Sequence, residues 1–309
     1  IFYAVSDGSF QVVLSNPIGA SSIESVGTTL NVVAQASQTA SLTLNVNGET
    51  VASSSGTSLE HALTFSVAGD YDIEINAETE SLTSSASTSV FALPETAPVV
   101  ASPEGLNDGI NHINDSTVIL QWTAPQKDFV FAVGDFNDWT LNGQSLMQNV
   151  GNDTTFWLQL NGLTPGEDYR YQYHILPDDI RVADAYAEVI LDKWNDPWIP
   201  ETTYPNLPPY PTLQATGPVS VFTPGEAAFE WTDDTFVRPD QENLVIYELL
   251  VRDFSEERTM KFIEDSLDYL ERLGVQAIEL MPINEFNGND SWGYNPTFYF
   301  AVDKAYGTK

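Results

Sequence analysis

The stretch from Val275 to Pro296 constrains the fold of this chain more than any other. Residues 275–281 form a short, nearly continuous apolar run that follows Gly274 and ends at Pro282. A continuous rather than alternating run of this length is typical of a parallel strand that is covered on both faces. The sequence therefore predicts a buried strand of a parallel sheet at this position.

The residues before this run complete a strand–helix–strand unit. Residues 244–251 form another apolar run, which predicts the first strand. Between the two runs, apolar residues at spacings of four and three predict a helix with one buried stripe: Ile263, Leu267 and Leu270. Thr259 is the expected N-cap of this helix, and Gly274 is expected to end it.

Polar and aromatic side chains follow the second strand directly, in residues 284–296. Ligands of parallel α/β sheets bind beyond the carboxyl ends of the strands, so a site is expected in this loop. An aromatic ring packs against the apolar face of a pyranose, while amides and carboxylates bond its hydroxyl groups. The candidate contacts to a sugar are Glu285, Trp292, Tyr294 and Asn295.

The charge balance excludes several kinds of partner. Eleven Lys and Arg stand against 44 Asp and Glu in 309 residues, a net charge of −33 at pH 7. This excess argues against nucleic acid and anionic membranes, because both attract cationic patches. The chain has no cysteine and no apolar run long enough to span a bilayer. We expect a secreted or cell-surface protein, whose leader was removed, was not included, or lay upstream of Ile1.

Two β-rich segments precede the α/β unit. Residues 1–93 are rich in Ser and Thr, with short strand-like runs and an Asn47-Gly48 hairpin turn, which predicts an immunoglobulin-like sandwich without catalytic chemistry. Residues 94–199 predict a second β-sandwich. Residues 200–240 are rich in proline and predict an extended junction, with a short strand at residues 229–231. The α/β unit is expected to occupy residues 241–309.

The motifs of this unit, taken together, resemble the opening of the catalytic barrel in the α-amylase family of glycoside hydrolases (family 13). They are Ile246-Tyr247-Glu248, Val251-Arg252-Asp253-Phe254, Leu273-Gly274-Val275, Ile278-Glu279-Leu280-Met281-Pro282, Ser291-Trp292-Gly293-Tyr294-Asn295-Pro296 and Ala305-Tyr306-Gly307-Thr308. Multidomain members such as branching enzymes and pullulanases are the most similar. The resemblance implies that residues 241–309 begin a (β/α)8 TIM barrel, which as a whole needs roughly 250 residues.

Part of the second β segment resembles the family-48 carbohydrate-binding module. The resemblance rests on three runs: residues 133–139, 169–173 and 183–187. In glucan-binding members, a Trp at the place of Trp139 stacks on glucose, with help from a Lys and a second Trp. Gln172 takes the Lys position here, and residues 176–179 offer no second Trp. Packing against the barrel is therefore favoured over glucan binding at Trp139.

The resemblance also implies a retaining glycosidase acting on starch, glycogen or maltooligosaccharides. The family takes its nucleophile Asp, acid/base Glu and stabilising Asp from the fourth, fifth and seventh barrel strands, so we assign no catalytic residue up to Lys309. A Tyr at the place of Tyr294 stacks on the sugar at the subsite of cleavage. No cofactor is expected, and calcium at Asn289 and Asp290 is a weak alternative because one loop does not supply about six oxygen ligands.

Two other functions stay open. A branching-type transglycosylase has the same motifs, because the loops that choose water or sugar as acceptor lie elsewhere. A non-catalytic α-glucan-binding surface protein is less favoured, because two strands of a parallel barrel leave edges and a face uncovered. The expected partner is an α-glucan, and a cell-surface glycan-uptake complex is a further candidate.

Overall fold

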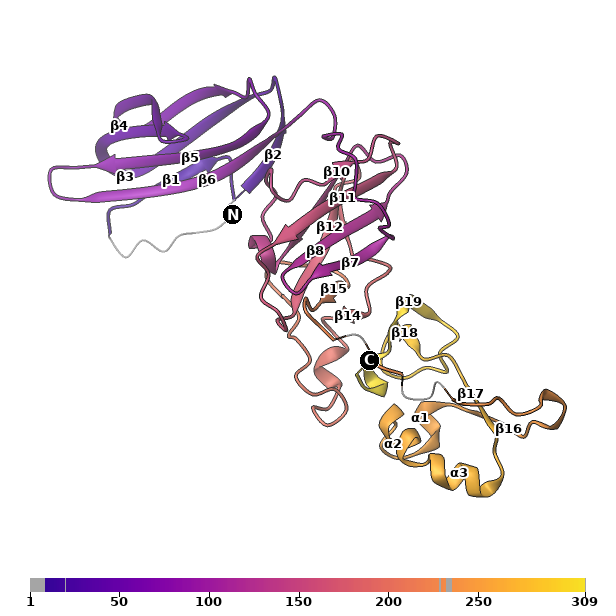
Figure 1. Ribbon diagram of the computed structural model, residues 1–309. Helices are drawn as coiled ribbons and strands as arrows, with labels where there is room; N and C mark the ends of the chain where they lie inside the picture. The colour runs from indigo at the N-terminus through magenta and orange to yellow at the C-terminus, as the bar shows by residue number, and fades with distance from the viewer. Residues whose placement is uncertain (1–8, 20, 228, 232–234, 309) are drawn as a thin grey trace. The chain divides into compact units, whose positions relative to one another are not determined.

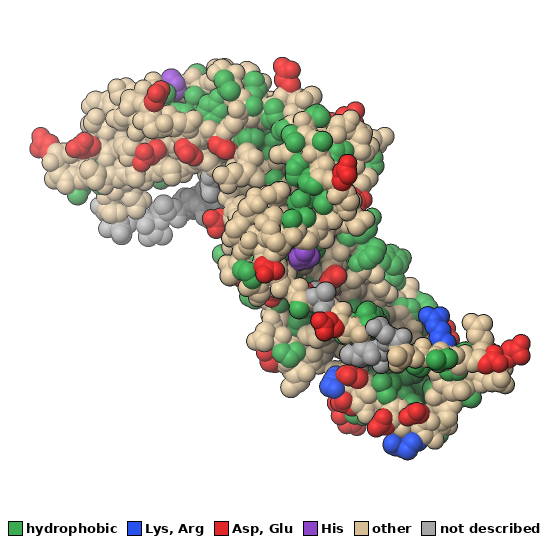
Figure 2. Space-filling model, in the orientation of Figure 1, with side chains coloured by type: hydrophobic (Ala, Val, Ile, Leu, Met, Phe, Trp, Pro, Cys, Tyr) green, Lys and Arg blue, Asp and Glu red, His purple; other side chains and the backbone are tan. Residues whose placement is uncertain are grey.

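The computed structural model describes residues 9–19, 21–227, 229–231 and 235–308 (Figure 1). The first eight residues of the predicted N-terminal domain thus lie outside the described part. The chain divides into two compact units, one of residues 1–99 and 140–147 and the other of residues 100–139 and 148–309. It is mostly β-sheet with few helices, as expected. Asp and Glu dominate the charged side chains on the face in Figure 2.

The first unit contains a six-stranded sheet: β1 (Val12–Asn16), β2 (Ser21–Ser25), β3 (Thr29–Val46), β4 (Glu49–Thr64), β5 (Gly69–Glu78) and β6 (Thr83–Leu93). The order is β1-β3-β5-β6-β2, with β4 paired to β3. Asn47 and Gly48 turn β3 into β4 with φ angles of 51° and 81°, so the predicted hairpin is confirmed. Alternate side chains of β3 and β5, such as Leu42, Leu44 and Ile73, are fully buried.

The first unit differs from the predicted sandwich in how its strands connect. In place of short strands, residues 29–46 form the single 18-residue strand β3. This strand pairs with β4 along its length, with β1 at its start and with β5 at its end. One continuous backbone ladder therefore joins β1, β4 and β5 through β3.

The β part of the second unit consists of two antiparallel sheets. The first has the order β10-β11-β8-β7 and contains β7 (Gly109–Asn114), β8 (Thr117–Thr123), β10 (Gln148–Asn149) and β11 (Thr155–Asn161). The second has the order β13-β12-β15-β14, with β9 on β12: β9 (Phe129–Gly134), β12 (Tyr169–Leu176), β13 (Ile180–Val182), β14 (Val189–Leu191) and β15 (Val219–Phe222). Trp122 of one sheet stacks on Tyr173 of the other, with ring centroids 4.9 Å apart.

The buried carboxylate of Asp184 explains two of the runs that resemble the carbohydrate-binding module, residues 169–173 and 183–187. The hydroxyl groups of Tyr171 and Tyr173 donate to Oδ2 of Asp184 at 2.8 and 3.0 Å, and the amide of Asp184 donates to Ser220 at 2.7 Å. All four residues are buried, and burial raises the pKa of Asp184. The Tyr-x-Tyr strand and the Ala-Asp-Ala-Tyr motif therefore hold β12, β15 and the intervening turn together.

Two expectations for residues 200–240 are corrected. Val219–Phe222 form β15, which lies between β12 and β14 in the sheet, so this part of the expected junction belongs to the β core. Residues 219–222, between Pro218 and Pro224, contain no proline, so their backbone amides are free to donate to the ladder. Residues 229–231 form no strand; Phe229 and Trp231 are exposed and contact each other edge to face.

The C-terminal part contains the expected strand–helix–strand unit. Its elements are β16 (Ile246–Leu249), α1 (Val251–Phe254), α2 (Met260–Asp265), α3 (Leu267–Leu273), β17 (Ala277–Leu280), β18 (Asn284–Phe286) and β19 (Pro296–Val302). Short 3-10 turns are η1 (Asp135–Asn137), η2 (Asp196–Trp198), η3 (Gln241–Asn243) and η4 (Lys304–Tyr306). β16 and β17 pair in parallel, and β18 pairs with β19 antiparallel.

The helix limits agree with the sequence, but the helix is interrupted. Oγ1 of Thr259 accepts from the Phe262 amide at 3.2 Å, and Gly274 ends α3 with φ 93°. The break falls at Ser266, whose hydroxyl donates to the Phe262 carbonyl at 2.8 Å. Such a bond competes with the helical ladder and bends it. No helix of the described residues has the length and apolar character needed to cross a membrane.

The parallel pair is covered on one side only, contrary to expectation. A small core contains Leu249, Val251 and Ile263, together with Phe286 and Tyr306. By contrast, Val245, Ile246 and Leu280 are 52%, 56% and 37% exposed. Two strands and one helical layer bury a single face, so the apolar character of these strands exceeds what the described residues cover.

Candidate functional site

The loop between β18 and β19 displays the two aromatic residues predicted to contact a sugar. Trp292 and Tyr294 are 62% and 67% exposed. Gly293 between them has φ 84°, and a Cβ on it would lie 2.0 Å from the carbonyl oxygen of Pro282. Only glycine permits this close approach, so the backbone is pressed against Pro282 while both neighbouring rings stay accessible.

Hydrogen bonds within the loop fix its shape. The hydroxyl of Ser291 donates to the side-chain oxygen of Asn295 and accepts from the Gly293 amide at 3.0 Å. The hydroxyl of Tyr306 donates to the Ser291 carbonyl at 3.4 Å. Asn295, predicted as a sugar contact, therefore also holds the loop that carries Tyr294.

Arg252 connects the loops that follow the two parallel strands. Its guanidinium donates to both carboxylate oxygens of Asp253, at 2.7 and 3.1 Å, and to Asp290 at 2.5 Å. The guanidinium lowers the pKa of Asp253, so this carboxylate is held ionised and is unsuited to donate a proton.

The two residues considered for calcium are engaged in other contacts. Asp290 is ion-paired with Arg252, and the side-chain amide of Asn289 donates to the Asn195 carbonyl at 2.7 Å. Among the described residues, no group of three or more His, Cys, Asp or Glu is arranged to hold a metal ion.

Glu285 lies in a buried ionic cluster rather than on the accessible part of the loop. Only 8% of its side chain is exposed, and Oε1 accepts from Nζ of Lys304 at 2.5 Å. It borders a cavity of about 160 Å³, below the roughly 300 Å³ typical of small-molecule sites. This burial argues against the predicted contact between Glu285 and a sugar, because a desolvated, paired carboxylate is not presented to a ligand.

Two further carboxylates complete this cluster around the ammonium group of Lys304. Oδ1 of Asp196 lies 3.3 Å from Nζ, and both carboxylate oxygens of Asp303 accept from backbone amides, those of Ala305 and Phe286. Lys304 is 2% exposed and Asp303 is also 2% exposed. The cluster ties η2 of the β part to β18 and η4 of the C-terminal part.

The charge balance within the cluster explains its protonation. Burial raises the pKa of Glu285 to about 7, while the Lys304 ammonium opposes this rise. Burial likewise raises the pKa of Asp196 and Asp303. Three carboxylates face one ammonium group, so Lys304 keeps its proton and one carboxylate takes up a proton readily.

Trp139 is placed in the interior and not on a glucan-binding surface. It is 8% exposed, and its indole nitrogen donates to Asp135 at 3.0 Å. Asp135 in turn receives bonds from the guanidinium of Arg170 at 2.7 and 3.0 Å. Gln172, at the position of the module's Lys, is fully buried and donates to the carbonyls of Thr216 and Pro218. This burial argues against glucan binding at Trp139, and the contacts of Trp139 named above lie within the β part.

The sequence analysis missed the Lys304 cluster. Its members come from three separate segments, and the hydrogen-bonded turn Asp303-Lys304 carries no pattern that predicts burial of a lysine. The one available hint is that lysine and arginine are rare in this chain. A lysine within an apolar strand–turn segment is then a candidate for burial in an ion pair with carboxylates.

Comparisons with known proteins agree with the motifs. No family model matches the chain. It is 36% identical to the malto-oligosyltrehalose trehalohydrolase of Saccharolobus solfataricus over 145 residues, covering 45% of this chain and 23% of that protein. It is 30% identical to the 1,4-alpha-glucan branching enzyme GlgB of Nitrosomonas europaea over 211 residues, covering 64% of this chain and 26% of that enzyme.

A solved structure, the GBS pullulanase SAP in complex with maltotetraose, matches with 18% identity and a TM-score of 0.45, covering 95% of this chain and 41% of that one. The chain spans about a quarter of the length of the two curated relatives. Their sequence similarity confirms the resemblance to the N-terminal region of α-amylase family glycoside hydrolases.

Proposed function

We propose that this chain is the N-terminal portion of an α-glucan-acting glycosidase of the amylase type. The observation that carries the proposal is the parallel β16–β17 pair, after which Arg252 joins the two loops and Trp292 and Tyr294 stand exposed. This is the edge of an α/β sheet at which ligands bind. The retaining chemistry would be supplied by an Asp, a Glu and a second Asp in the protein beyond residue 309.

The proposed architecture is two immunoglobulin-like β domains followed by the first strand, helix and second strand of a (β/α)8 barrel. The exposed apolar residues of the parallel pair, Val245, Ile246 and Leu280, support it, because further strands and helices of a barrel would cover them. The domains would span residues 1–93, 94–240 and 241–309, with β15 now included in the second domain.

Within this site, Tyr294 would stack on the sugar next to the cleaved bond, with Trp292 at the neighbouring subsite. The test is Tyr294→Ala in the full-length protein. We expect kcat/KM on maltooligosaccharides to fall by about tenfold, because a stacked ring contributes roughly 1 kcal/mol beyond its buried area. Tyr299→Ala is the control, since Tyr299 is 70% exposed on β19 outside the loop. Equal kinetics for both variants would remove Tyr294 from the site.

A branching-type transglycosylase is the second candidate. It is favoured by the similarity to branching enzymes, which extends over 64% of the chain. The two reactions differ in acceptor: hydrolysis creates reducing ends, whereas branching conserves their number and creates new branch linkages. Incubation of the full-length protein with amylose, followed by reducing-end and linkage analysis, separates them.

We propose a location outside the cell or on its surface. The net charge of −33 supports it, because a strongly acidic surface suits an extracellular setting and keeps a protein soluble. The cell-surface partner would be a glycan-uptake complex. Fractionation of the source cells, with detection of the protein by antibody, tests the location; recovery only in the cytosolic fraction would refute it.

A further inference from the structure

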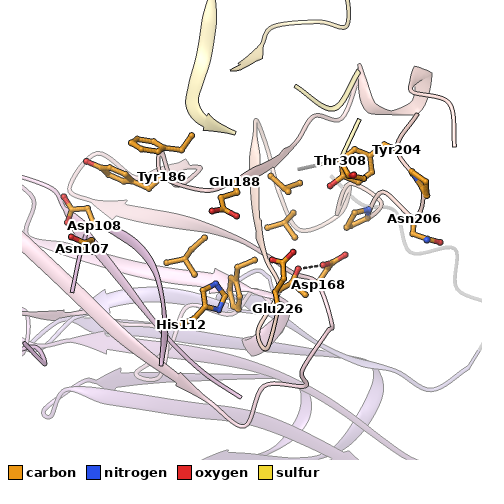
Figure 3. Close-up of a pocket in the computed structure, with 18 residues that line it drawn as sticks. Asn107, Asp108, His112, Asp168, Tyr186, Glu188, Tyr204, Asn206, Glu226 and Thr308 are labelled. Carbon is orange, nitrogen blue, oxygen red and sulfur yellow. Dashed lines mark hydrogen bonds between the residues drawn. The ribbon is translucent and has the colours of Figure 1, made fainter. Parts of the chain in front are cut away.

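A large cavity lies within the second unit, away from the loop that carries Tyr294. Its volume is about 780 Å³, and its walls come from β7, β14, β15 and β19 and from the proline-rich residues 204–208. Figure 3 shows Tyr186 on one side, Tyr204 and Asn206 on the other, and Glu188 between them. The size falls in the range of pockets that hold small organic ligands.

The walls combine aromatic rings with acidic groups. Tyr186 and Phe300 form an aromatic pair with centroids 5.0 Å apart and an interplanar angle of 34°. They are 38% and 59% exposed, so a ring face remains accessible. Four carboxylates share the walls, those of Asp108, Asp168, Glu188 and Glu226.

Neighbouring residues fix several of these side chains in place. A Cβ on Gly109 would lie 2.5 Å from Cβ of Tyr186, so only glycine lets this tyrosine pack so close to β7. The carboxylate of Asp108 accepts from Thr123 at 3.0 Å, and that of Asp168 accepts from Thr223 at 2.5 Å. Part of the binding surface is therefore ordered before a ligand arrives.

We propose that this cavity is a second α-glucan-binding site, which holds a neutral oligosaccharide segment against the Tyr186–Phe300 pair. Sugar hydroxyls would donate to the carboxylates, while the apolar face of a pyranose would pack on the rings. The ligand class rests on the proposed function. The site is separate from the two considered earlier, because neither Trp139 nor Tyr294 lines it.

The charge of the walls excludes other ligands. Among the described residues that line the cavity, none is Lys or Arg, so a phosphate or another anion would meet only repulsion. A metal ion is disfavoured because the described residues contain no cluster suited to one. A polyamine would also satisfy the carboxylates, so it serves as the competing ligand in the test.

The experiment uses the full-length protein and the double variant Tyr186→Ala/Phe300→Ala. Alanine at position 186 keeps the Cβ that packs over Gly109, and both rings are partly exposed, so folding should be retained. The matched control is Tyr299→Ala, which removes an exposed ring next to Phe300 that does not line the cavity. Retention in a glycogen-containing native gel gives the dissociation constant, and kcat/KM is measured on maltotriose and on glycogen.

In the double variant, the dissociation constant for glycogen should rise by at least about tenfold. The ratio of kcat/KM on glycogen to kcat/KM on maltotriose should also fall. Tyr299→Ala should change neither quantity. Unchanged retention, or retention lost to spermidine competition but not to maltoheptaose, would overturn the proposal. A protein that turns over no α-glucan, yet shows retention that depends on the two rings, would refute the proposed enzyme and support the cavity.

Discussion

Replacement of Lys304 by methionine is the sharpest test of the buried ionic cluster. Methionine has a similar length but no charge, so the variant leaves Glu285, Asp196 and Asp303 facing one another without a cation. Only 3% of the Lys304 side chain is exposed, and 8% of each of the Glu285 and Asp196 side chains. Solvent therefore screens these charges poorly.

The stability that Lys304→Met should lose follows from the distances between Nζ of Lys304 and the carboxylate oxygens. At an effective dielectric constant of about 20, attraction across 2.5 Å to Glu285 is about 7 kcal/mol, and across 3.3 Å to Asp196 about 5 kcal/mol. Desolvation of the buried ammonium offsets several kcal/mol of this attraction. Loss of one partner from a buried ion pair costs about 3 to 5 kcal/mol, so we expect about 4 kcal/mol at about pH 8. The cost should shrink at lower pH, where protonated carboxylates no longer need Lys304.

Hydrogen–deuterium exchange of residues 284–306 in the full-length protein reports this local free energy of opening. The matched control is Lys261→Met, which breaks surface pairs with Glu264 and Asp265; Lys261 is 68% exposed, so solvent screens these pairs and we expect no measurable change in the free energy of opening. The double variant Lys304→Met/Glu285→Leu should recover part of the loss. If Lys304→Met lowers the free energy of opening no more than the control does, Lys304 is not the charge that holds these segments together.

Two further predictions concern the same segment. The pKa of Glu285 in the folded protein, about 7, is above its unfolded value, so the folded state binds an extra proton between these values. Local stability should therefore rise by about 1 to 3 kcal/mol as the pH falls from about 8 to about 5, and Glu285→Gln should reduce this rise in exchange measurements. Gly293→Ala should lower kcat/KM on maltooligosaccharides and destabilise the loop by about 1 to 3 kcal/mol in thermal unfolding. The control is Gly288→Ala: Gly288 also has a positive φ, but no atom lies near the added Cβ, so only the smaller cost of backbone strain is expected.

The local structure followed from short sequence patterns where backbone chemistry decides it. Asn47-Gly48 gave a hairpin, Thr259 a helix cap and Gly274 a helix stop, because each residue type satisfies one particular backbone requirement. The parallel pairing of β16 with β17 followed from two apolar runs joined by a helix.

What the sequence missed depends on contacts between distant segments. β15 was hidden because its pairing with β12, rather than local propensity, makes it a strand. Glu285 looked accessible in a polar loop, but it is buried and paired with the ammonium group of Lys304. Trp139 has the sequence context of a sugar-binding tryptophan, yet it is buried and donates to Asp135, which Arg170 also binds. Burial of this kind is set by tertiary packing and leaves no periodic pattern.

In the proposed function, these residues begin a retaining α-glucan-acting barrel. The most direct measurement is the anomeric form of the sugar first released by the full-length protein from a maltooligosaccharide, followed by proton NMR before mutarotation. A retaining mechanism that passes through a covalent glycosyl-enzyme predicts initial release of the α-anomer. Initial release of the β-anomer, or no turnover of any α-glucan, would contradict the account.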